Sequence, residues 1–479
     1  MFSAARLLIL STATALAVSL FPQLSHAAPK VAQGATCKSL NVKTKFQGKT
    51  YTCIKKNGKL VWGKGVPSNS GSKNNESKNS NDVKNVLYSA PTQIGSNIDL
   101  CKIKDVSAAR INAEPGKERV GTGFPEMKSI IPTKGTIKWA LIPIDFKNLP
   151  GESNFRSRVD DQMKTLTEWY DTVSEGNLKI EWVVYDKWVR LPRNTSEYRI
   201  DQSSNLDREK NGIKLWNDAM AASDPVFDFT DIQTVNFILP KGQTFLTETS
   251  QGFPQDDPVI NLVTNEGKVR SFAIAGQYFD LPGKTYWSYW AHEFGHAIGI
   301  GHVGSSRESN PFSYYDLLGS QDGPSRELSG WFRFFAGWLA PERIHCQEVS
   351  KLTTNEITLV PLSSKETGLK VVVIPTSNTK AIVIESRRVT KFDCKTPTPR
   401  NGVLVYTYDA TLGHGDVLFN AITPGPRPLE RDECGILNNR TEPSANLLLT
   451  EGEKVSVEGI TVEILLHGNR DKIRISKSN

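Results

Sequence analysis

The chain has 479 residues, of which 38% are hydrophobic, 23% charged and 9% aromatic. This length and mixture exclude a fibrous or wholly disordered protein and suffice for two or three globular domains. The net charge of +7 is uneven, because residues 29–90 hold twelve lysines, no arginine and two acids. With the +1 of Arg6 also removed, residues 91–479 carry −4, so the basicity belongs to the amino-terminal part alone. We expect no nucleic-acid partner.

The chain begins with a pattern typical of an export signal. Arg6 precedes an apolar run over residues 7–20, and Ser25 and Ala27 place small side chains before a cleavage site after Ala27. The run has about 14 residues, whereas about 20 are needed to cross a bilayer, so no membrane-spanning helix is expected after signal removal. The sequence therefore predicts a signal peptide over residues 1–27 and a secreted protein, either extracellular or associated with the cell surface.

Residues 28–66 predict a small lysine-rich module. They contain Cys37, Cys53 and a Lys-Asn-Gly turn signal at 56–58, a pattern typical of a hairpin-rich fold closed by one disulfide. Residues 67–90 are too polar to form a core and predict a flexible linker. The lysines fit two roles: contact with an anionic cell-surface polymer, or a solvated tether that keeps the protein soluble.

The cysteines of the mature chain are even in number, which favours three disulfides outside the cytoplasm. They are Cys37, Cys53, Cys101, Cys346, Cys394 and Cys434. The first two are a plausible local pair, whereas the sequence leaves the pairing of the other four open. Their spacing is too wide for a Cys-x-x-Cys metal site.

After the linker the pattern becomes mixed α/β. Apolar residues recur at helical spacing over residues 155–174, and Gly176 ends that helix. A second helix is predicted over 206–222, and strands are predicted over 137–146, 178–191 and 234–240. Beyond residue 346 short β-forming runs alternate with Gly, Pro and Asn, which is typical of a β-sandwich. These runs are EITLVPL, LKVVVIP, AIVIES, GVLVYTY and ITVEILL.

Residues 292–302 read HEFGHAIGIGH and carry the clearest chemical signal. His292 and His296 are four residues apart, so on a helix they project from one face and can hold a single ion. Glu293 lies about 100° further round, beside the ion, where a carboxylate can act as a general base.

The position of His302 requires a break in that helix. On a straight helix it would lie about 15 Å from His292 along the axis, too far for a shared metal bond near 2 Å. Gly299 can adopt the positive φ that ends a helix sharply, so His302 can return as a third ligand. Three nitrogen ligands leave one position of tetrahedral Zn²⁺ open, as in catalytic sites.

The pattern HExxHxxGxxH is the signature of metzincin metallopeptidases, and the chain resembles the immune inhibitor A family of secreted bacterial proteases. The similarity extends over most of residues 135–479 and includes IPIDF, WYDTVSEGNLKIEWVVYDKWVRLP, SYYDLLGS, LSGWFRFFAGWLAP, IVIESRR and GVLVYTYD. The resemblance implies an α+β protein. We expect a metzincin-like zinc peptidase domain with a mixed sheet and active-site helix over 91–345, and a β-sandwich-like domain over 346–479.

Two features depart from this family. Metzincins place a methionine in the turn beneath the metal, but every methionine here precedes the site, so Leu318, or less favourably Leu317, must fill that place. The third ligand is often aspartate in the immune inhibitor group, whereas this chain has His302. No oxyanion stabiliser is implied with clarity; Tyr314 and Tyr315 are candidates that could equally be packing residues.

We therefore expect a secreted zinc endopeptidase in which His292, His296 and His302 bind one catalytic Zn²⁺ and Glu293 activates water. The resemblance implies an extended polypeptide substrate added to a sheet edge. Residues 271–279 are a candidate edge, although a buried core strand is an equal interpretation.

Other features of this expectation stay open. The alternative function is a catalytically retired scaffold that acts as a secreted surface-binding protein. An additional structural Ca²⁺ stays an open option, because the sequence does not identify its ligands. Residues 86–130 could be a pro-segment with Cys101 on the metal, but the even cysteine count favours a disulfide.

Overall fold

The computed structural model describes residues 32–40, 42–46, 49–64, 66–67, 97–112, 120–126, 131–200, 205–247, 249–252, 262–304, 310–394, 401–413, 416–431 and 443–478. The predicted signal peptide, nearly all of the predicted linker, and Cys434 lie outside the described residues. The chain divides into two compact units, Met1–Asn81 and Asp82–Asn479. In the described part, no helix is both long and apolar enough to span a membrane.

The first unit contains a small antiparallel sheet closed by a disulfide. Its strands are β1 Lys43–Phe46, β2 Lys49–Lys56, β3 Lys59–Trp62 and β4 Val66–Pro67, and β2 pairs with each of the others. Asn57 and Gly58 form the β2–β3 turn with positive φ values of 48° and 79°, which confirms the predicted turn. Cys37 and Cys53 are bonded with their Cα atoms 5.9 Å apart, which confirms the predicted local pair.

The second unit begins with a sheet flanked by helices. The helices of this unit are α1 Ala108–Ile111, α2 Arg156–Val173, α3 Asn205–Ser223, α4 Tyr286–Ala297 and α5 Gly330–Phe335, with 3₁₀ helices η1 Ile98–Cys101, η2 Thr195–Tyr198, η3 Gln277–Asp280, η4 Pro311–Tyr315, η5 Pro341–Arg343 and η6 Val349–Lys351. The strands of the sheet are β5 Gly135–Asp145, β6 Leu178–Val184, β7 Val189–Arg190, β8 Ile232–Ile238, β9 Thr249–Gly252 and β10 Ser271–Ala275. The predicted helices and strands of this region are present, with one predicted strand divided into β6 and β7.

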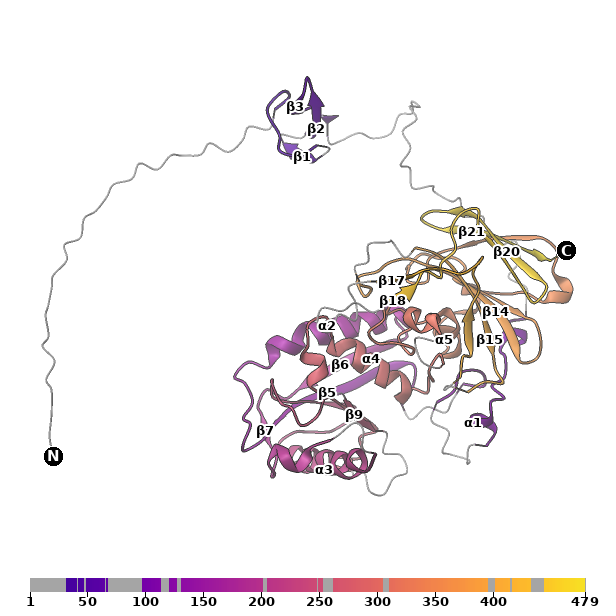
Figure 1. The fold of residues 1–479 in the computed structure, drawn as a ribbon. Helices are drawn as coiled ribbons and strands as arrows, with labels where there is room; N and C mark the ends of the chain where they lie inside the picture. Colours follow the sequence, from indigo (N-terminus) through magenta and orange to yellow (C-terminus); the bar gives the residue numbers. More distant parts are fainter. Residues whose placement is uncertain are drawn as a thin grey trace, which may run out of the picture. The chain divides into compact units, whose positions relative to one another are not determined.

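The sheet has the order β6–β5–β8–β10–β9, with β7 beside the end of β5. All pairs are parallel except β10 with β9. Successive residues of β5 point to opposite faces: Ile137 and Trp139 join the core that includes α2 and α4, whereas Ala140 and Ile142 join the core that includes α3. Helices therefore cover both faces (Figure 1), which explains why this strand is almost continuously apolar.

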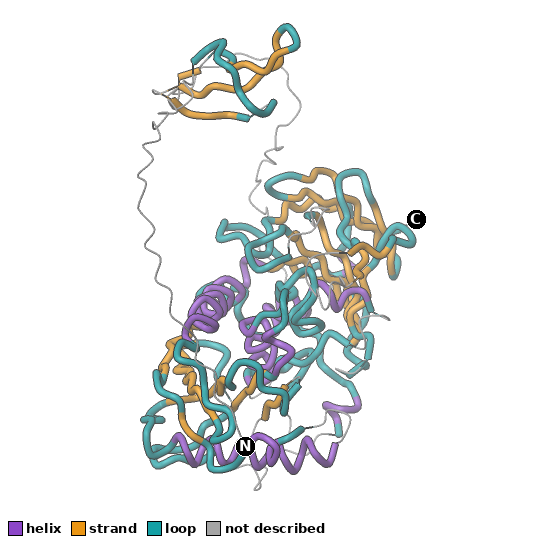
Figure 2. The backbone as a smooth tube through the Cα atoms, turned by 60° about the vertical axis from the view of Figure 1, so that its left-hand side comes forward, coloured by secondary structure: helices purple, strands orange, loops and turns teal. Residues whose placement is uncertain are grey.

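The carboxy-terminal part is built from β-sheets (Figure 2). One sheet has the order β11 Ile344–Cys346, β13 Val371–Pro375, β14 Lys380–Arg387, β15 Gly402–Asp409 and β16 Phe419–Ala421. A second has the order β12 Asn355–Leu359, β21 Asp471–Lys477, β20 Ile460–His467 and β19 Lys454–Val457, and β17 Leu429–Arg431 pairs with β18 Pro443–Ala445. The five β-forming runs of the sequence correspond to β12, β13, β14, β15 and β20.

The sheet containing β14 is buried on both faces. Val372 and Ile384 face the second sheet and form a core with it, whereas Val371 and Val383 belong to the core of α4 and α5. This shared core accounts for the single compact unit of residues 82–479. The fold is mixed α/β with several sheets and few helices, which agrees with the expected α+β class.

A second disulfide connects distant parts of this unit. Cys101 of η1 is bonded to Cys346 of β11, with the Cα atoms 5.8 Å apart. Cys394 is also disulfide-bonded. Cys101 is therefore a structural cysteine and not a ligand of the candidate metal site.

Candidate metal centre

Helix α4 carries the first two histidines of the motif into the interior. Its sequence YWSYWAHEFGHA is apolar on almost every side, as expected for a helix that is buried all round. The hydroxyl of Tyr170 on α2 donates to the carbonyl of Ala291 at 2.9 Å, and the ring of Phe294 lies 4.5 Å from that of Trp139. The helix is thus fixed against α2 and the sheet on both sides of His292.

The chain turns sharply after α4, as the sequence predicted. The helix ends at Ala297, and Gly299 has a φ of 96°, a left-handed conformation that favours glycine. The amide of Ile300 then donates to the carbonyl of Gly295 at 2.9 Å, which closes the turn. This geometry returns His302 to the side of the helix that carries His292 and His296.

The three imidazoles converge on one point. The Nε2 atom of His302 lies 3.2 Å from that of His292 and 3.0 Å from that of His296. Three nitrogens bound to a tetrahedral Zn²⁺ at 2.0–2.1 Å are separated by about 3.3 Å, so the spacing fits the ion. Within the described residues, this triad is the one group of three potential ligand side chains whose ligand atoms lie within 4.8 Å of one another. The triad can bind a metal.

Backbone carbonyls fix the protonation of two of the rings. His292 Nδ1 lies 2.7 Å from the carbonyl oxygen of Leu317, and His296 Nδ1 lies 2.8 Å from that of Ile300. A carbonyl only accepts, so each neutral ring carries its proton on Nδ1 and presents a bare Nε2 to the centre. This outer hydrogen bond is the one that metal-binding histidines usually make.

A strand-like segment from far upstream supports the third ligand. The amide of Gly121 donates to the carbonyl of Gly299 at 2.9 Å, and the amide of Gly301 donates to the carbonyl of Gly121 at 2.8 Å. The segment is itself anchored, since Thr122 donates to the carboxylate of Asp105. The residues before the sheet are therefore part of the frame that positions His302.

The turn beneath the site is built on a buried carboxylate. Asp316 accepts hydrogen bonds from the amides of Leu318 at 2.8 Å and Ser329 at 2.7 Å. Burial raises the pKa of Asp316 to about 6, although the hydrogen bonds from these two amides lower the pKa. The turn places Leu318 against α4, because a Cβ at Gly295 would lie 3.1 Å from Leu318 Cδ1. Leu318, rather than Leu317, faces the helix between the two histidines.

Replacing Leu318 tests this packing role. Leu318→Met should change the free energy of unfolding by less than about 1.5 kcal/mol and leave the metal affinity of the triad unchanged, because the volume is conserved. Leu318→Ala should cost about 2–5 kcal/mol, since it leaves a cavity under α4. Urea unfolding of both variants measures the difference; equal stabilities would contradict a packing role.

Glu293 follows His292 on α4 and lies in an environment that disfavours its charge. The residue is only 9% exposed, and burial raises the pKa of its carboxyl to about 8. A bound cation next to this carboxyl would favour the ionised form, since an opposite charge lowers the pKa of an acid. The arrangement therefore pairs a metal-binding triad with a buried group able to hold a proton.

The two tyrosines considered as oxyanion stabilisers are both buried. The hydroxyl of Tyr315 donates to the carbonyl of Ala445 at 2.8 Å and accepts from the amide of Leu447 at 3.2 Å. Tyr315 therefore holds the β-region rather than facing the metal centre. The carbonyl of Tyr314 accepts from the amide of Ser325 at 3.1 Å.

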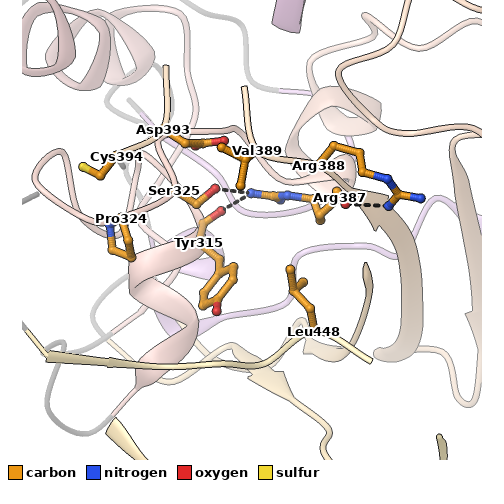
Figure 3. A pocket seen from close by; sticks show the side chains of 9 residues that line it. All are labelled: Tyr315, Pro324, Ser325, Arg387, Arg388, Val389, Asp393, Cys394 and Leu448. Atoms are coloured by element: carbon orange, nitrogen blue, oxygen red, sulfur yellow. Dashed lines mark hydrogen bonds between the residues drawn. The ribbon is translucent and has the colours of Figure 1, made fainter. Parts of the chain in front are cut away.

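Sequence reasoning missed a buried arginine behind the turn. Arg387 of β14 donates through Nη2 to the carbonyl of Tyr315 at 2.6 Å and to Ser325 Oγ at 3.0 Å, as Figure 3 shows. Its Nη1 pairs with Glu385 at 2.5 Å, and Glu385 in turn accepts from the amide of Gly330. The only sequence signal was the run IVIESRR, which indicated a strand and no contact with the site.

Of the candidate edge at residues 271–279, Ser271–Ala275 forms the buried core strand β10, which is the alternative interpretation, and Gln277–Asp280 forms η3. β10 pairs with β8 on one side and β9 on the other, and all five of its residues are buried. Among the strands that the structure describes, β9 lies at the end of the sheet order and is the edge on this side.

Comparison with known proteins assigns no family. No family model and no curated protein matches the chain. Two crystal structures of wild-type OgpA from Akkermansia muciniphila align at 12% and 13% identity with TM-scores of 0.28 and 0.29, each over 74% of this chain and 97% of that chain. Catalytically inactive OgpA in complex with an O-glycopeptide substrate aligns at 13% identity with a TM-score of 0.27, over 74% and 96% of the chains. At these TM-scores the likeness indicates neither a function nor a role for any residue.

Proposed function

We propose that this protein is a secreted zinc-dependent endopeptidase of the metzincin type. His292, His296 and His302 would hold one Zn²⁺, and Glu293 would be the general base. The observation that carries the proposal is the convergence of three Nε2 atoms, two of them on rings whose Nδ1 atoms face backbone carbonyls. Three protein ligands with an adjacent carboxyl suit a catalytic site, whereas a structural zinc site is usually closed by a fourth protein ligand.

The roles of the protein groups follow from their positions. When bound, Zn²⁺ supplies Lewis-acid chemistry that polarises a carbonyl and makes water more acidic. Glu293 accepts the proton of the water that attacks the scissile carbonyl carbon, and then delivers it to the leaving nitrogen. The carbonyls of Leu317 and Ile300 hold the rings of His292 and His296 in one tautomer throughout.

The sheet offers a place for an extended substrate. β9 pairs antiparallel with β10 and ends the order of the described strands, which is the position at which an extended peptide would add a strand. We therefore place a polypeptide substrate along β9, which replaces the edge at residues 271–279 considered from the sequence. Export is supported by the signal pattern and by disulfides in both compact units.

Metal removal tests the proposal directly. Purified mature protein should contain one zinc per chain and hydrolyse casein, and a chelator should reduce hydrolysis to background because the Lewis acid is lost. One equivalent of Zn²⁺ should restore it. Casein hydrolysis and metal content by mass spectrometry provide the two readouts.

A serine-protease inhibitor is the matched control and should leave the rate unchanged. Zinc bound at one per chain without hydrolysis of any polypeptide would favour the retired surface-binding scaffold. Hydrolysis that survives complete zinc removal would contradict the metal-dependent mechanism.

A further inference from the structure

The lysine-rich module, residues 28–66, has a charge composition that the peptidase function does not explain. It contains nine lysines and no arginine, and the first acidic residue of the chain is Glu76. No lysine can therefore form an ion pair with a carboxylate side chain inside the module. Its side chains carry a positive field that is not neutralised locally.

The strand register brings three of the lysines to one face of the sheet. Lys43 of β1 is opposite Thr52 of β2, and side chains two residues apart on a strand share a face. Lys56 of β2 therefore points to the same side, together with its partner Lys59 of β3. All three are exposed.

The tip of the β2–β3 hairpin holds a pair of like charges. Lys56 and Lys59 are direct cross-strand partners across the Asn57–Gly58 turn, so their Cβ atoms are about 4.5–5.5 Å apart. Like charges directly opposite one another destabilise a sheet. An anionic group between the two ammonium groups would remove this repulsion, so the hairpin tip is suited to an anion.

The distribution of charge distinguishes between kinds of anionic partner. Lys49 and Lys55 lie on the other face of β2, so both faces of the small sheet carry exposed lysines. A planar membrane can contact only one face, whereas a flexible polymer chain can follow both. The ammonium group of lysine is a point charge and lacks the planar, bidentate geometry of the arginine guanidinium. Lysines therefore suit a partner with a high density of negative charge better than a partner recognised by its nucleic-acid bases.

We propose that the lysine-rich module binds a linear, phosphate-bearing polyanion of the cell surface that follows both faces of the sheet, and that Lys43, Lys56 and Lys59 are its contacts on one face. Binding is electrostatic and releases counterions from the polymer, so it weakens steeply with salt. This function is independent of the metal centre. It would retain the secreted protein at the cell surface.

The test uses the full mature chain and immobilised polyphosphate, with affinity measured at several salt concentrations between about 50 and 200 mM. Replacing Lys43, Lys56 and Lys59 with Gln should weaken binding at low salt and reduce the slope of log affinity against log salt by about 2, at about 0.7 per contact. Replacing the same three with Arg should preserve the slope, because the charge is kept.

Matched controls separate this surface from general basicity. Replacing Lys147, Lys187 and Lys241 of the second unit, which are also exposed, with Gln should leave polyphosphate binding unchanged. Casein hydrolysis should be equal in all variants. Wild-type protein should also bind isolated cell walls, and should lose that binding when phosphodiester polymers are stripped from them.

Several outcomes would overturn the proposal. One is a Gln variant that binds with the wild-type slope, which would leave the module as a solvated tether. Stronger binding to vesicles of equal parts phosphatidylglycerol and phosphatidylcholine than to polyphosphate would assign a membrane surface instead. Stronger binding to single-stranded DNA of the same charge would assign nucleic acid.

Discussion

Glu293→Gln should lower kcat for casein or peptide hydrolysis by about 10²–10⁴-fold while leaving zinc stoichiometry and folding intact. The amide has the shape of the carboxyl but cannot accept the proton of the attacking water. Folding should not suffer, because burial disfavours the charged form of Glu293 and the amide is neutral. Steady-state kinetics, zinc content and urea unfolding measure the three quantities.

The control for this variant is Glu342→Gln, an exposed glutamate of η5 outside the metal centre. It should retain wild-type kcat. Near-normal turnover of Glu293→Gln would remove Glu293 from the general-base role while leaving the metal triad in place. Loss of zinc together with activity would instead indicate that the carboxyl supports the ligands.

The parts of the site that the sequence predicted are those that depend on local geometry. The four-residue spacing of His292 and His296 determines one helix face, and the sharp turn that returns His302 needs a residue that tolerates positive φ. Gly299 meets this need with a φ of 96°. The helix over residues 155–174 could be predicted for the same reason, because its apolar residues recur at the spacing of successive helical turns.

Contacts between residues far apart in the sequence could not be predicted from such local patterns. Gly121 pairs with the backbone around Ile300, and Cys101 is bonded to Cys346 across a sequence separation of 245 residues. The residues around each position do not specify its distant partner, because another glycine or cysteine elsewhere in the chain would fit the local pattern equally well. Connectivity of disulfides is likewise undetermined by sequence alone.

The edge-strand prediction shows where an apolar run is ambiguous. SFAIA lacks the alternation of polar and apolar residues that indicates a strand with one solvent-exposed face, and its pattern does not say whether the backbone is paired on both sides. It is buried on both faces and paired on both sides, whereas the true edge, β9, has the polar sequence TSQG. Polarity at β9 indicated a loop as readily as a strand.

The β-region and the candidate metal centre are connected through the turn that carries Tyr315 and Leu317. His292 is oriented by the carbonyl of Leu317, and Arg387 holds the carbonyl of Tyr315 two residues earlier. The same guanidinium is paired with Glu385, whose other oxygen accepts from the first amide of α5. A change in β14 should therefore reach the metal through the turn.

Arg387→Met should destabilise the folded protein by about 3–5 kcal/mol and weaken zinc binding by about 10–100-fold. The first effect arises because Glu385, which is fully buried, loses its charged partner. The second arises because the turn that orients His292 loses its support, and outer hydrogen bonds typically contribute that much to metal affinity. Urea unfolding and competition with a zinc chelator measure the two effects.

The double variant Arg387→Met/Glu385→Gln separates the two causes. Removing the uncompensated carboxylate should recover much of the stability, because a neutral amide can still interact with the amide of Gly330 and the hydroxyl of Tyr406. Zinc affinity should stay low, since the carbonyl of Tyr315 is still without its donor from Arg387. If the double variant regained wild-type zinc affinity, the guanidinium would have no positioning role, and its effect would be only that of an ion pair.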